Sequence, residues 1–107
     1  MNRGDLVTAV ISGAYGKPRP ALVVQSDAFA DLPSVTILPL TTHLQPAPLI
    51  RITVELDGEN GLEQRSQIMI DKAATVPRGK IGRRFGRVDD ATMRAVGQAL
   101  RMFLGID

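Results

Sequence analysis

Arg19 is held between two prolines in the segment Lys17-Pro18-Arg19-Pro20, which precedes an apolar run at 21–24. Each proline fixes its own φ angle and pushes the residue before it into an extended conformation, so the backbone of Arg19 has little freedom. A guanidinium is a planar fork of donors that matches the oxygens of a phosphate. An arginine fixed at the mouth of a strand therefore indicates an anion site, whereas a surface arginine in a turn is the alternative interpretation.

Three other residues carry groups that could act on the same anion. Thr41 follows Pro39, and because a proline cannot donate to a central ladder, we expect pairing to end there and the threonine hydroxyl to lie at a strand end. Asp71 ends another expected strand, with a capping or salt-bridged aspartate as the alternative. His43 is the only histidine, and histidine is the usual group for proton transfer near neutral pH. It would share a face with Thr41 if the strand continued that far, with a surface loop histidine as the alternative.

The elements that must position these side chains are mostly strands. Apolar, β-branched or alternating patterns predict strands at 6–11, 21–25, 35–40, 50–56 and 67–71, with a turn at 57–61. Segment 75–87 is basic and contains glycines, and we expect a short helical turn and a final short strand there. Met93, Val96, Leu100, Phe103 and Leu104 recur at helical spacing and predict an amphipathic helix that begins at Asp89 and Asp90 and ends at Gly105. We expect the stripe of Met93, Val96, Leu100 and Phe103 to lie in the core.

These elements predict a mainly β fold: a small, strongly curved β-barrel with one C-terminal α-helix packed on it and short helical turns. The first strands are nearly all apolar, which indicates burial on both faces and makes a second copy of the chain a reasonable cover for one of them. The length of 107 residues, 44% of them apolar, suits a single domain over 1–107.

Composition excludes several kinds of site. There is no cysteine, which excludes disulfides and thiolate metal ligands, and a single histidine argues against zinc. We therefore expect no metal and no cofactor. No apolar stretch approaches the ~20 residues of a membrane span, and the first residues do not form a signal peptide, so we expect a cytoplasmic protein.

The charge is distributed unevenly, although the net charge is only +2. Residues 1–77 hold 6 basic and 8 acidic side chains, whereas residues 78–107 hold 7 basic and 3 acidic ones. A basic segment on a slightly acidic body is compatible with a nucleic-acid or acidic-protein partner, and a solvated charged face is the alternative.

An ordered set of motifs resembles the MazF/PemK (Kid) family of toxin endoribonucleases. The set consists of Arg3-Gly4-Asp5, the run from Arg19-Pro20 to Ser26-Asp27, Pro39-Leu40-Thr41, the run from Ser66 to Lys72, Thr75-Val76 and the terminal amphipathic helix. The resemblance implies an SH3-like or CcdB-like barrel that forms a homodimer and is neutralised by a cognate antitoxin. It also implies metal-independent cleavage of single-stranded RNA at short sequences, leaving a 2′,3′-cyclic phosphate and a 5′-hydroxyl.

The resemblance assigns the catalytic pair to Arg19 and Thr41. Arg19 would stabilise the phosphorane with charge-assisted donors, and Thr41 would donate to a non-bridging oxygen. The proton acceptor is less clear, because loop 12–18 lacks the glutamate that many relatives carry, and Met69 stands where some have an arginine. Asp71 remains a candidate base, since one branch of the family gives this role to the matching aspartate. His43 is a candidate on its chemistry alone.

Several residues are candidates for substrate contacts. Tyr15, in a predicted loop near Arg19, could stack on a base, with a packing residue as the alternative. Lys17, Arg51 and Arg65 could contact phosphates, as could Arg83, Arg84 and Arg87, whose position relative to Arg19 the sequence does not give. Two other functions stay open at this point: a CcdB-like inhibitor of DNA gyrase, and a nucleic-acid-binding barrel that has lost its catalytic base.

Overall fold

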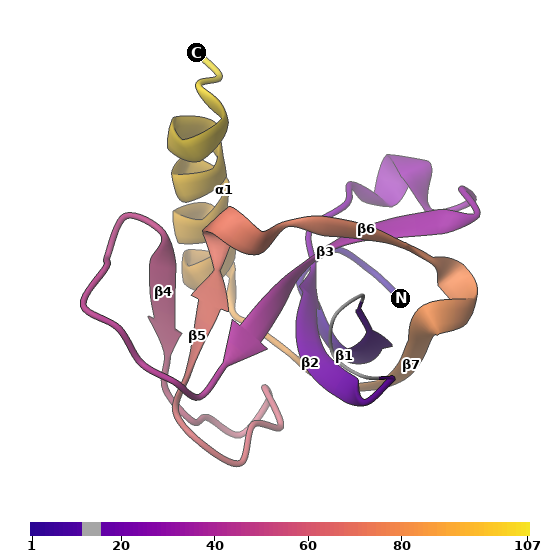
Figure 1. Ribbon diagram of the computed structural model, residues 1–107, viewed down its shortest axis with the longest axis horizontal. Helices are drawn as coiled ribbons and strands as arrows, with labels where there is room; N and C mark the ends of the chain where they lie inside the picture. The colour runs from indigo at the N-terminus through magenta and orange to yellow at the C-terminus, as the bar shows by residue number, and fades with distance from the viewer. Residues whose placement is uncertain (12–15) are drawn as a thin grey trace.

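A computed structural model describes residues 1–11 and 16–107 of the chain, which form a curved sheet with one long helix at its side (Figure 1). The strands are β1 (Asp5–Val10), β2 (Pro18–Val23), β3 (Ser34–Thr41), β4 (Arg51–Val54), β5 (Ser66–Met69), β6 (Ala74–Pro77) and β7 (Ile81–Arg87). The helix is α1 (Asp90–Leu104), and three short 3₁₀ turns are η1 (Asp27–Phe29), η2 (Ile70–Lys72) and η3 (Arg78–Lys80). The mainly β fold with a C-terminal helix is confirmed.

All strand pairs are antiparallel, and the spatial order is β4-β5-β3-β2-β1-β7, with β6 also paired to β3. One edge of β3 has two partners in succession. Its first half pairs with β6 as far as Ile37, and its last residues pair with β5 from Leu40 onward. Pro39 lies between these two ladders, where its missing N–H leaves no hydrogen bond unmade. We expected pairing to end at Pro39; instead β3 changes partner there and continues to Thr41.

The prolines beside Arg19 lie inside β2. The sequence pattern had placed them before the strand, so this prediction is wrong. Pro18 and Pro20 pair with β1, opposite Val10 and Thr8. The pairing of β2 with β3 starts only at Ala21, so neither proline occupies a position where that ladder needs an N–H.

The two faces of the sheet bury alternate residues of the same strands. Leu6, Leu22 and Leu38 belong to one apolar cluster, together with Val96 of α1. Val7, Val23 and Ile37 belong to the other cluster, which the curved sheet encloses. The apolar strands are thus covered on both faces within one chain, so their composition is no argument for a second copy.

Helix α1 has the ends that the sequence predicts. The Asp89 carboxylate accepts a hydrogen bond from the Thr92 backbone N–H at 2.7 Å, and Gly105 ends the helix in the left-handed region at φ 68°. The expectation that the apolar stripe is core holds for Val96 but is wrong for Phe103. Phe103 and Leu104 are 49% and 59% exposed, because the helix extends beyond the strands that it covers (Figure 1).

Two other expectations change in the second half of the chain. Segment 75–87 contains a helical turn, as expected, but this turn joins two strands; β6 was not predicted, and β7 is a full-length strand. Strand β5 ends at Met69, so Asp71 lies in the turn η2 rather than at a strand end.

Candidate active site

Three of the predicted site residues line one open hollow of about 790 Å³. Arg19 comes from β2, Thr41 from the end of β3, and Asp71 from η2. The remaining wall consists of Ile11, Pro20, Pro39, Leu40, Thr42, Met69, Lys72 and Ala73. The hollow therefore combines a cation, a hydroxyl and a carboxylate over a largely apolar floor.

The register of the sheet explains why Arg19 and Thr41 meet. The last pair between β2 and β3 is Ala21 with Pro39. Continuing that register by two residues places Arg19 opposite Thr41 on the same face, because residues directly opposite in an antiparallel pair point the same way. The two strands are no longer paired at this point, and the hollow opens between them.

Arg19 presents an uncommitted cation to this hollow. Its side chain is exposed, and it makes no ion pair or side-chain hydrogen bond with residues 1–11 or 16–107. Thr41 is held in place by the His43 backbone N–H, which donates to its Oγ1 at 3.0 Å. A hydroxyl has one proton and two lone pairs, so accepting that bond leaves the O–H of Thr41 able to donate.

Asp71 is anchored from below by Arg51, which donates to its Oδ1 through Nη1. The Arg51 side chain is only 9% exposed, and its Nε is buried with no partner among the described residues. Little of this guanidinium is open to a phosphate, although we expected Arg51 to contact one. Its observed contact instead fixes the position of the Asp71 carboxylate at the wall of the hollow.

The other predicted contacts are dispersed. His43 is exposed on the bend after β3 and is absent from the lining of the hollow. Lys17 is exposed just before β2, and Arg65 pairs with Glu55 at 2.8 Å on the surface. Tyr15 lies outside the described residues.

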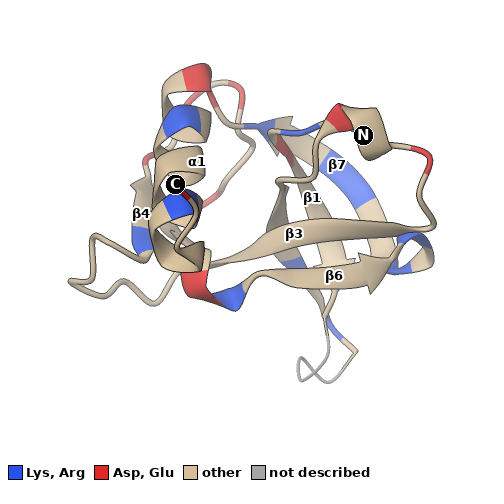
Figure 2. Ribbon diagram, turned by 90° about the horizontal axis from the view of Figure 1, so that it is seen from above, with Lys and Arg blue, Asp and Glu red and all other residues tan. Residues whose placement is uncertain are grey.

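The basic C-terminal third does not form one surface. Arg83, Arg84 and Arg87 lie on β7, whereas Arg94 and Arg101 lie on α1, and the two elements come close only where β7 ends and α1 begins (Figure 2). Arg84 and Arg87 both face the buried Asp5, at 3.1 and 3.9 Å from its Oδ1. Burial raises the pKa of Asp5, but the hydrogen bond from the Asn2 backbone and the Arg84 guanidinium outweigh it, so the pKa lies below its ordinary value.

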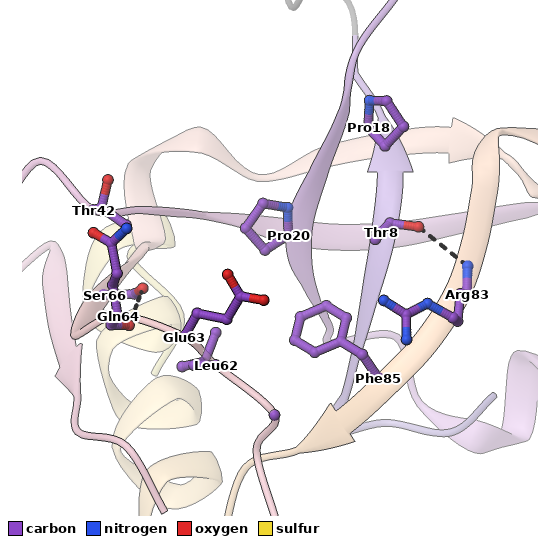
Figure 3. Close-up of a pocket in the computed structure, with 11 residues that line it drawn as sticks. Thr8, Pro18, Pro20, Thr42, Leu62, Glu63, Gln64, Ser66, Arg83 and Phe85 are labelled. Carbon is purple, nitrogen blue, oxygen red and sulfur yellow. Dashed lines mark hydrogen bonds between the residues drawn. The ribbon is translucent and has the colours of Figure 1, made fainter.

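A second hollow of about 510 Å³ adjoins the first, and no motif in the sequence predicted it (Figure 3). Pro20 and Thr42 line both hollows. The rest of its wall comes from Thr8, Pro18, Gly61, Leu62, Glu63, Gln64, Ser66, Arg83 and Phe85. Glu63 and Phe85 were missed because they are far apart in the chain, and only the folded loop between β4 and β5 brings them together.

Two kinds of feature are absent from residues 1–11 and 16–107. No helix there is long and apolar enough to cross a membrane. No group of 3 or more histidine, cysteine, aspartate or glutamate side chains in that part is arranged to hold a metal ion.

Comparison with known proteins points to one family. The family model described as a PemK-like, MazF-like toxin of type II toxin–antitoxin systems matches residues 2–104. A curated relative from Mycolicibacterium smegmatis, named as a probable endoribonuclease MazF, is 48% identical over 107 residues, which are 99% of this chain and 98% of the relative.

Solved structures share the fold of this chain. The toxin MazF-mt6 of Mycobacterium tuberculosis superposes with a TM-score of 0.82 at 26% identity, over 96% of this chain and 98% of that one. A MazF structure from Deinococcus radiodurans shares the fold with a TM-score of 0.83 at 19% identity, over 99% and 97% of the two chains. A mycobacterial endoribonuclease solved in complex with its cognate antitoxin shares the fold at 0.81 and 24% identity, over 100% and 97%.

Proposed function

This chain belongs to the family of PemK-like, MazF-like toxins of type II toxin–antitoxin systems and is a MazF-like endoribonuclease toxin. We propose that it cuts single-stranded RNA, with the cleaved phosphate bound between the side chains of Arg19 and Thr41. The observation that carries this proposal is the shared hollow. In this hollow a guanidinium that is unpaired among the described residues faces a hydroxyl that can donate a hydrogen bond. Two such donors can stabilise the negative charge that forms on the phosphate oxygens in a phosphorane-like transition state.

The reaction that fits these groups is an internal transfer of the phosphate. The ribose 2′-oxygen loses its proton and attacks phosphorus, and the bond to the 5′-oxygen breaks. The products are a 2′,3′-cyclic phosphate and a 5′-hydroxyl whose proton comes from solvent in the open hollow. Arg19 and Thr41 donate hydrogen bonds to the non-bridging oxygens, on which charge increases in the transition state. These steps need no metal ion.

We assign the proton acceptor to Asp71 rather than to His43. Asp71 lines the hollow, and Arg51 occupies its Oδ1 and leaves Oδ2 for the 2′-hydroxyl proton. His43 contributes its backbone N–H to Thr41, and its imidazole lies outside the residues that line the hollow. Lys17, which is exposed just before β2, remains a proposed phosphate contact, and Tyr15 and Arg65 remain proposed substrate contacts.

The partners follow from the family. We propose that the protein acts in the cytoplasm as a homodimer, that a cognate antitoxin neutralises it, and that release from the antitoxin during a stress response activates cleavage. Met102, Phe103 and Leu104 at the end of α1, together with Ile106 just beyond it, form an exposed apolar patch that supports an interface between protomers.

One experiment tests the activity against the two other functions. The protein is incubated with a long single-stranded RNA in EDTA, and the new ends are mapped and their chemistry determined. We expect cuts at a short recurring sequence with 2′,3′-cyclic phosphate ends. We expect Arg19→Ala to slow cleavage at least about 100-fold, the scale of losing one transition-state donor.

Arg94→Ala is the matched control, since it removes an exposed arginine on α1 and should cleave like the wild type. Intact RNA with trapped complexes of gyrase and DNA would indicate the gyrase inhibitor. Intact RNA that is still bound would indicate a binding module without catalysis.

A further inference from the structure

The second hollow continues the candidate active site along the surface. Pro20 and Thr42 line both hollows. An RNA strand with a phosphate at Arg19 can therefore place its next nucleotide in the second hollow. A volume of about 510 Å³ leaves space for one nucleobase and its sugar. Arg83 lies at the far rim, where its side chain makes no ion pair with any residue that the structure describes.

The walls of this hollow offer two complementary contacts to a base. Figure 3 shows the Phe85 ring and the Glu63 carboxylate directed into the same space, from β7 and from the loop between β4 and β5. Phe85 is half-buried and packs against the core cluster that includes Val96, so its ring is a fixed platform. Stacking on such a ring accepts any base, because every base has a π-face.

Glu63 supplies the contact that can discriminate among bases. Its side chain is exposed and makes no ion pair or hydrogen bond within the described part of the chain. An ionised carboxylate is an acceptor only, and it repels phosphates. At a base edge, a carboxylate accepts from an exocyclic amino group, such as the one on cytosine.

The loop that carries Glu63 is fixed before any ligand arrives. Asn60 is fully buried; its Nδ2 donates to the Glu55 carbonyl at 2.8 Å, and its Oδ1 accepts from the Leu62 N–H at 3.1 Å. A Cβ on Gly61, which has φ +65°, would lie 2.3 Å from the Phe85 carbonyl oxygen. This close approach of loop and strand sets the position of Glu63 relative to Phe85.

We propose that the hollow between Glu63 and Phe85 is a nucleobase subsite next to the cleaved phosphate, and that Glu63 selects a base with an exocyclic amino group over uracil. This proposal rests on the proposed ribonuclease activity. Phe85 supplies stacking, Glu63 the choice of base, and Arg83 a contact to the phosphate that follows.

The test uses the full-length protein and a long RNA of randomised sequence, with the cut positions read by sequencing the ends. For the wild type, we expect amino-bearing bases to exceed uracil about tenfold at one position beside the cut, the discrimination of a single base-edge contact. Glu63→Gln, which can also donate, should reduce that preference to less than about threefold. Glu59→Gln is the matched control on the same loop, outside the hollow, and should keep the wild-type preference.

Phe85→Leu keeps an apolar side chain against the core and should raise the KM for RNA about tenfold while leaving the preferred base unchanged. An unchanged base preference in Glu63→Gln, with Arg19-dependent cleavage intact, would overturn the subsite alone. If Arg19→Ala cleaved RNA as fast as the wild type, the proposed function would be overturned, and the subsite with it. Because Glu63 is exposed, its variant gives an answer even if Phe85→Leu does not fold.

Discussion

At the scale of single residues, the site separates groups that face the hollow from groups that hold them there. Arg19 and Thr41 face it, whereas Arg51 lies beneath Asp71 and the His43 backbone holds Thr41. Residue type alone did not distinguish these roles, because Arg51, three strands away from Arg19 in the sheet, could equally have bound phosphate. The buried position of Arg51 is what assigns it to support.

The choice of Asp71 over His43 as proton acceptor gives a residue-scale prediction. Asp71→Asn should slow single-turnover RNA cleavage about 100-fold, because general-base catalysis contributes on that scale. His43→Ala should stay within about twofold of the wild type at every pH tested, since the imidazole is absent from the hollow. Thermal unfolding of both variants provides the control for folding. A rate that falls with His43→Ala and not with Asp71→Asn would reverse the assignment.

At the scale of elements, the sequence predicted the helix and most strands because their patterns are periodic and local. It failed where the structure depends on partners. Strand β6 is short and carries little apolar alternation, and it forms because the first half of β3 offers a free edge. The prolines of β2 looked like a strand boundary. They are tolerated inside the strand because β2 pairs with β3 only from Ala21 onward.

The candidate site was predictable to the same extent. Arg19 and Thr41 could be named from motifs, and the register then shows why they meet. Glu63 and Phe85 could not, since the hollow depends on the close packing of two backbone segments, at Gly61 and Gly86, that no periodicity encodes.

The pairing of β1 with β7 gives an element-scale prediction in acid. Since the pKa of Asp5 in the folded protein lies below its ordinary value of about 3.9, its ionised form stabilises the fold above that pH. This contribution is lost as the pH falls through the lower folded pKa. Asp5→Asn should therefore unfold at lower urea than the wild type at pH 7, and should lose less stability between pH 5 and pH 3.

The matched control is Asp31→Asn, which removes the same charge from an exposed position. Equal loss of stability in acid for the wild type and Asp5→Asn would show that the contacts of Asp5 with Arg84 and Asn2 do not stabilise the fold.

At the scale of the whole molecule, the chain covers both faces of its own sheet but leaves the end of α1 uncovered. Such an apolar end on a protein of this size is typical of an interaction surface. It also replaces the earlier reason for expecting a dimer, which was the composition of the strands.

This uncovered helix end gives a prediction at the scale of the whole molecule. Phe103→Asp should convert a dimer to a monomer in sedimentation velocity, because a charge at an apolar interface loses its hydration. Leu32→Asp is the control, since Leu32 is 46% exposed in the segment between η1 and β3. A wild type that sediments as a monomer at all concentrations, or a Phe103→Asp variant that sediments as a dimer, would contradict the interface.

In the loop between β4 and β5, the residues that hold the loop against β7 are different from those whose side chains are exposed. The exposed residues can therefore be changed without disturbing the packing of the loop. Asn60 and Gly61 are locked against β7, whereas Glu63 and Gln64 project beyond them with exposed side chains. A combinatorial library randomised at 63 and 64 alone should therefore consist mostly of folded proteins. Selection from such a library could retarget cleavage to new RNA sequences while Arg19 and Thr41 stay unchanged.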